Sequence, residues 1–181
     1  MPPVVLLPGD SPPGPPAPEL RRTAGRLAGI PWIAVLAGKV PAAHLELALG
    51  ATVLLADRRA VLLPPGGRPP LLPDTGWRLA RRLGAGGALA YWTSPRPWTA
   101  ARAGRRGLVD VVARDPLDRA ATIRAVLGRH PAVAAWLEIL GRHGSNPGER
   151  AGLALERAFF ALAFTREDAR EGARRFLDRS R

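Results

Sequence analysis

Residues 31–65 read PWIAVLAGKVPAAHLELALGATVLLADRRAVLLPP, and this stretch decides the fold. Trp32 to Leu36 is apolar on both faces and partly β-branched, which predicts a strand that is covered on both sides. Gly38 is predicted to end the strand, because glycine favours a turn. A helix and two more strands are then predicted, in chain order, at His44 to Gly50, Thr52 to Leu55 and Ala60 to Leu63. This order of elements indicates an α/β domain.

The segments on either side of this stretch extend the pattern. Val4 to Leu7 is a short apolar run closed by Pro8-Gly9-Asp10, which predicts a buried strand and a turn. Ser11 to Pro18 is dense in proline and predicts a stiff linker. Three further helices are predicted at Glu19 to Leu27, Pro116 to Leu127 and Ala132 to Leu140, with Asp115 as the cap of the second.

Composition bounds the class of protein. At 181 residues with 46% hydrophobic content, the chain can bury one core, which is typical of a single domain. The absence of cysteine excludes disulfides, thiolate nucleophiles and cysteine-ligated metal sites, and no three other ligands have the spacing of a metal site. The opening MPPVVLLPGDSPPG has no basic leader, and its apolar run is too short for a signal peptide or a membrane span. We therefore expect a cytoplasmic protein without a metal and without membrane contact.

The net charge of +12 would attract anionic partners. Clustered cations would point to nucleic acid, but Lys39 is the only lysine and the arginines are scattered along the sequence as pairs. The distribution is typical of a GC-rich coding bias and disfavours nucleic-acid binding as the main role. A milder consequence is attraction to a small anionic ligand. The pairs are Arg21-Arg22, Arg58-Arg59, Arg81-Arg82, Arg105-Arg106 and Arg174-Arg175.

The stretch at 31–65 resembles the core signature of the crotonase (enoyl-CoA hydratase/isomerase) superfamily. In that signature an apolar strand runs into a glycine-rich turn, a helix opening with xELAL, a second strand and a Pro-Glu turn. Two later blocks are similar to the family as well, and all three occur in the family's order. The second block matches at Thr93, Ala100, Ala103, Gly107, Leu108 and Val109, and the third at Glu167, Asp168, Glu171, Gly172 and Phe176.

The resemblance implies an α/β fold, the crotonase-like (ClpP/crotonase) spiral of ββα units, truncated at the N-terminus and followed by C-terminal oligomerisation helices. Residues 1–114 would form the shortened spiral core and residues 115–181 the helical oligomerisation region of the same structural unit. Family members assemble as trimers or dimers of trimers, so we expect a homotrimer or a hexamer. The apolar residues that would support this assembly are Leu153, Leu155, Phe159, Phe160, Leu162 and Phe164.

The resemblance also implies a site in which two backbone N–H groups hold a thioester oxygen. Alignment from Val4 places Pro15 at the first donor, and proline has no N–H to donate. A slip of one or two residues puts Gly14 or Ala17 there instead. Ala43 falls at the second donor, where its N–H survives but a turn with positive φ would be strained.

Two carboxylates usually move the protons in this family. Glu46 stands at one of them, and Pro65 replaces the other, so standard hydration is not expected. A carboxylate in the first turn of a helix is also favoured by the macrodipole, which is an alternative role for Glu46. His44 is a candidate proton shuttle, unless it only fills the space that glycine left. Asp74, beside Gly76, is a candidate substitute for the missing carboxylate.

Two functions follow. The first is an acyl-CoA enzyme with one carboxylate, of the isomerase or lyase type, which needs no cofactor because CoA is part of its substrate. The second is a catalytically silent crotonase-fold subunit that assists a full-length crotonase partner in a biosynthetic pathway. Glu46 separates them, since only the first requires its chemistry.

Overall fold

The computed structural model describes residues 2–9, 17–28, 30–68, 70–72 and 74–130. The chain separates into two compact units, residues 1–125 and 126–181. Of the second unit, only residues 126–130 are described. The division into a spiral core at residues 1–114 and a helical oligomerisation region at residues 115–181 stays a prediction.

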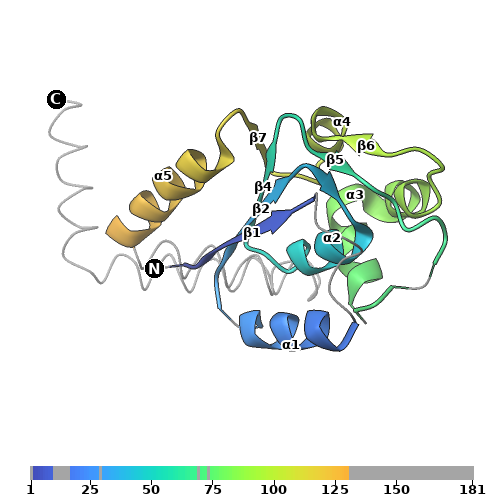
Figure 1. Ribbon diagram of the computed structural model, residues 1–181, viewed down its shortest axis with the longest axis horizontal. Helices are drawn as coiled ribbons and strands as arrows, with labels where there is room; N and C mark the ends of the chain where they lie inside the picture. The colour runs from blue at the N-terminus through green and yellow to red at the C-terminus, as the bar shows by residue number, and fades with distance from the viewer. Residues whose placement is uncertain (1, 10–16, 29, 69, 73, 131–181) are drawn as a thin grey trace, which may run out of the picture. The chain divides into compact units, whose positions relative to one another are not determined.

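Four parallel strands form the main sheet of the first unit (Figure 1). Their order is β1-β2-β4-β7, and each strand pairs in parallel with its neighbour. Almost every residue of the two central strands is apolar, as expected where both faces of a parallel sheet are covered. The bounds are Val4–Pro8 for β1, Ile33–Ala37 for β2, Val53–Asp57 for β4 and Val111–Ala113 for β7.

Three very short strands form a second sheet. They are β3 (Lys39–Val40), β5 (Val61–Leu62) and β6 (Trp98–Thr99), in the order β3-β5-β6. Strand β3 follows β2 directly, and Gly38 between them has a φ of 68°, a backbone conformation that favours glycine. This glycine therefore lets the chain leave the main sheet and join the second one.

Helices cover both faces of the main sheet. Successive residues of a strand point to opposite faces, so Leu36 and Leu54 pack with one set of helices, while Val35 and Leu55 pack with another. Helices α1, α2, α3 and α4 contribute to the larger cluster, and α5 contributes Ala120 to the smaller one. The bounds are Ala17–Leu27 for α1, Ala42–Ala48 for α2, Thr75–Trp92 for α3, Ala100–Arg105 for α4 and Pro116–Arg129 for α5.

The ends of the helices confirm part of the predicted capping and correct another part. Asp115 accepts a hydrogen bond from the backbone N–H of Asp118 at 3.0 Å, which confirms it as the cap of α5. The predicted linker is too long by two residues, because α1 begins at Ala17 and Pro18 stands in its first turn. Helix α3 is kinked at Gly84, where φ is 72° and ψ is 164°.

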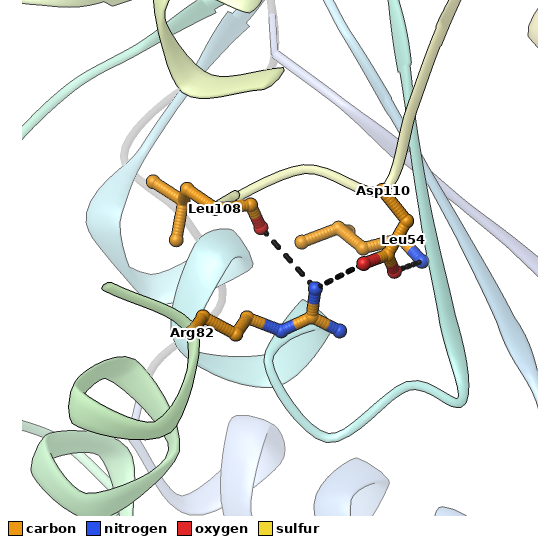
Figure 2. Close-up of polar contacts among 4 residues, drawn as sticks. All are labelled: Leu54, Arg82, Leu108 and Asp110. Atoms are coloured by element: carbon orange, nitrogen blue, oxygen red, sulfur yellow. Dashed lines mark hydrogen bonds and ion pairs between the residues drawn. The ribbon is translucent and has the colours of Figure 1, made fainter. Parts of the chain in front are cut away.

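An ion pair braces α3 against the main sheet (Figure 2). Nη1 of Arg82 lies 2.7 Å from Oδ1 of Asp110, and Oδ2 of the same carboxylate accepts the backbone N–H of Leu54 at 2.7 Å. The backbone N–H of Asp110 in turn donates to the carbonyl of Leu54 at 2.9 Å. One aspartate just before β7 thus holds the start of β4 and the middle of α3 together.

Several predictions fall on residues 131–181, outside the described residues. They are the helix from Ala132 to Leu140, the apolar cluster from Leu153 to Phe164, and the third block of family resemblance. The predicted trimer or hexamer therefore stays a prediction. Among the residues that are described, no helix is long and apolar enough to cross a membrane.

Candidate active site

The candidate site is built on the first turn of α2. Pro41 precedes the helix in an extended conformation, and its carbonyl accepts the N–H groups of His44 and Leu45 at 3.1 and 3.2 Å. The N–H of Ala43, at the second helical position, has no acceptor one turn back within the helix. No described residue except glycine has a positive φ, so Ala43 sits there without the strain that the sequence suggested.

Glu46 occupies the middle of α2 and is only 4% exposed. Its Oε2 accepts three hydrogen bonds, from the backbone N–H of Leu71 at 2.7 Å, the backbone N–H of Leu72 at 2.9 Å and Oγ1 of Thr75 at 3.0 Å. Its Oε1 has no partner in the described part of the chain and is not completely enclosed. Among the described residues, the carboxylate is thus fixed through one oxygen and has no partner at the other.

The three donors to Glu46 all belong to the segment that leads into α3. Thr75 is fully buried and is the first residue of that helix. The sequence does not single out Thr75, because a threonine at the start of a helix is common, and the other two donors are backbone groups. The carboxylate therefore ties α2 to the start of α3 in addition to anything it does chemically.

His44 lies two residues before Glu46 and is 7% exposed. Burial lowers the pKa of His44 below its usual value of 6.5, and a hydrogen bond to the backbone of Pro8 partly opposes this. Its Nδ1 is buried without a partner in the described part of the chain. The ring is therefore neutral at neutral pH and lies beside the end of β1.

Asp74 and Pro65 are not brought into contact with Glu46. The carboxylate of Asp74 is held by Arg78, with Oδ2 2.6 Å from Nε, and it is the following residue, Thr75, that reaches Glu46. Pro65 is buried in a turn, where its carbonyl accepts Nε of Arg68 at 3.0 Å. Among the described residues, Glu46 is thus the buried carboxylate of the site.

The end of β1 also converges on this region. Gly9 is packed so closely on the junction of β2 and β3 that a Cβ would lie 2.6 Å from the carbonyl oxygen of Ala37 and would clash with the backbone of Lys39. Two candidates for the first donor, Gly14 and Pro15, lie outside the described residues, whereas the third, Ala17, is the first residue of α1. The described residues therefore include the carboxylate of Glu46 and two candidate backbone donors, Ala43 and Ala17.

Comparison with known proteins decides the family. Residues 25–181 match the family described as enoyl-CoA hydratase/isomerase. The chain belongs to this family. Within the crotonase superfamily it is 33% identical, over 165 residues, to proteins named "Probable enoyl-CoA hydratase echA8" from Mycobacterium bovis and Mycobacterium tuberculosis. The matched region covers 87% of this chain, and the chain spans 64% of the length of these relatives.

Solved structures confirm the crotonase fold. An enoyl-CoA hydratase from Thermoplasma volcanium matches with a TM-score of 0.74 at 22% identity, over 88% of this chain and 66% of its own. An enoyl-CoA hydratase from Polaromonas sp. JS666 matches with a TM-score of 0.70 at 27% identity, over 90% of this chain and 66% of its own. The α/β architecture predicted from residues 31–65 is therefore the crotonase architecture.

Proposed function

We propose that this crotonase-family chain binds an acyl-CoA thioester and transfers a proton at the carbon beside the thioester carbonyl, with Glu46 as the single base. The observation that carries the proposal is the asymmetry of the Glu46 carboxylate. Three hydrogen bonds fix Oε2, while Oε1 has no partner among the described residues. A base that is fixed in advance loses little freedom when it meets its substrate, which favours catalysis.

The same arrangement supports an isomerase or lyase reaction over standard hydration. Hydration by the usual mechanism needs one carboxylate to activate water and a second to handle the other proton. Pro65 stands where the family resemblance places the second carboxylate, and proline cannot carry a proton. The backbone N–H of Ala43 supplies one donor for enolate charge, and a donor of this kind is typically worth about 3 kcal/mol in the transition state.

Deuterium exchange tests the proposal directly. The protein is incubated with butyryl-CoA in D2O, and loss of the α-proton signal is followed by NMR. We expect exchange above the background rate with the wild-type chain and none with Glu46→Gln. The amide keeps an oxygen acceptor for the three donors but is no base. The matched control is Glu19→Gln, which changes an exposed glutamate in the first turn of α1 and should leave exchange unaffected.

The second candidate function is a silent subunit that assists a full-length crotonase partner. Its supporting observation is that the three hydrogen bonds give Glu46 a complete structural role without any chemistry. A silent subunit would leave α-proton exchange at background in the wild-type chain, and Glu46→Gln would not change the partner's rate. A thermal shift with CoA separates binding from catalysis, because a ligand at 100 times its Kd stabilises the folded state by about 2.7 kcal/mol.

A further inference from the structure

Six exposed arginines that are scattered in the sequence belong to three neighbouring segments of the first unit, and we call them the arginine strip. They come from the turn after β4, the end of β7, and helix α4 with the residue that follows it. Figure 1 shows these three segments next to one another. The six are Arg58, Arg59, Arg102, Arg105, Arg106 and Arg114, and all of them are exposed.

Hydrogen bonds between the backbones hold the three segments together. The N–H of Arg58 donates to the carbonyl of Ala113 at 2.9 Å, which places the turn after β4 beside the end of β7. The N–H of Ala100 donates to the carbonyl of Ala60 at 2.9 Å, which brings the start of α4 to the same turn. The six arginines are therefore carried by segments of the folded framework that lie next to one another.

Within the described residues, no ion pair neutralises the positive charge of the strip. None of its six side chains forms an ion pair or a side-chain hydrogen bond within the part of the chain that the structure describes. The guanidinium of Arg102 stacks 4.3 Å over the ring of Trp98, a contact that orients it and leaves its donors available. Asp57 and Asp115 adjoin the strip in sequence, and each accepts a backbone N–H nearby. Six arginines and two carboxylates leave a net charge of +4.

We infer that the arginine strip binds the phosphate backbone of a nucleic acid, without sequence selectivity. Exposed guanidinium groups on neighbouring segments suit the phosphates of a nucleic-acid backbone, with which guanidinium forms paired hydrogen bonds. An interface with a folded protein usually has an aromatic or apolar centre. Among the described segments that form the strip, Val112 is the one large hydrophobic residue in the exposed class, and it is only 36% exposed. The surface therefore suits phosphates better than a protein face.

The test measures binding of a fluorescent 20-base-pair DNA duplex by anisotropy between 50 and 200 mM salt. Each phosphate contact contributes about 0.9 to the slope of log affinity against log salt. We therefore expect Arg58→Gln/Arg59→Gln to flatten the slope by about 1.8 and to weaken binding roughly 60-fold at 0.1 M salt. Arg105→Gln/Arg106→Gln should act in the same way, and circular dichroism checks that both variants fold.

The matched control is Arg22→Gln/Arg26→Gln, which removes two exposed arginines of α1, outside the strip. It changes the net charge equally and should leave the slope close to the wild-type value. An equal loss of affinity in this control would overturn the proposal, because net charge alone would then explain binding. Displacement of the duplex by poly-L-glutamate at equal charge concentration would also overturn it, in favour of an acidic protein partner. Displacement by micromolar CoA would assign the strip to the thioester site instead.

Discussion

Replacement of Glu46 by leucine should cost stability far beyond the loss of one surface charge. The change removes the acceptor of three hydrogen bonds and leaves the N–H groups of Leu71 and Leu72 and the hydroxyl of Thr75 without a partner. A buried donor without a partner costs about 1–3 kcal/mol. Because the N–H of Leu71 is only partly buried, the sum is about 3–6 kcal/mol. That is a large part of the 5–15 kcal/mol by which a typical protein is stable.

Urea unfolding, followed by the fluorescence of the five tryptophans, measures this cost, since Trp32 among them is buried and becomes exposed on unfolding. Thr75→Val is the matched partial variant, since it removes one donor and nearly conserves the shape of the side chain. It should cost about 1–2 kcal/mol, and much less in the Glu46→Leu background, where its hydrogen bond is already lost. A loss below about 1 kcal/mol in Glu46→Leu, or full additivity of the two changes, would refute the anchoring of α3 by Glu46.

Three further outcomes are expected. Burial lowers the pKa of His44, so below pH 6.5 the unfolded chain takes up a proton at this residue more readily than the folded chain does. This contribution to stability is complete above pH 6.5 and is lost as the pH falls below it. His44→Gln should therefore reduce the change of the urea midpoint between pH 7 and pH 5. Asp110→Ala should lower the urea midpoint more than Arg82→Leu, because only Asp110→Ala leaves the N–H of Leu54 without its side-chain acceptor. Equal losses would contradict this. Gly9→Ala should cost at least about 1–3 kcal/mol, since its Cβ would overlap the chain between β2 and β3, and an unchanged midpoint would exclude that close approach.

Most elements of the first unit could be predicted from the sequence, because the spacing of apolar residues within each segment is recognisable without knowledge of its tertiary contacts. Seven predicted elements lie within a few residues of their observed bounds. They are the strands β1, β2, β4 and β5 and the helices α1, α2 and α5. Strands β3 and β6 were missed, because each has two residues and exists only through pairing with β5. A two-residue strand leaves no periodicity for sequence analysis to detect.

The site was predicted less completely, for a physical reason. Glu46 could be singled out from its family position, yet its partners lie 25 to 29 residues further along the chain. Two of them are backbone N–H groups, which every residue except proline carries, so no pattern of side chains in the sequence can predict them. The arginines show the converse, because pairs that are far apart in the sequence become neighbours once β4, β7 and α4 pack together.

The structural role of Glu46 changes how its presence should be interpreted. A glutamate that anchors two helices has a reason to stand in α2 even in a chain that catalyses nothing, so its match to a catalytic position does not by itself indicate catalysis. The chemical role rests on Oε1 alone, the oxygen for which the described part of the chain provides no partner. Glutamine keeps the anchoring oxygen and removes the basic one, whereas leucine removes both. If Glu46→Gln abolishes proton exchange and keeps most of the stability, the chain is an enzyme. If Glu46→Gln changes neither property and Glu46→Leu lowers only the stability, the chain is a scaffold.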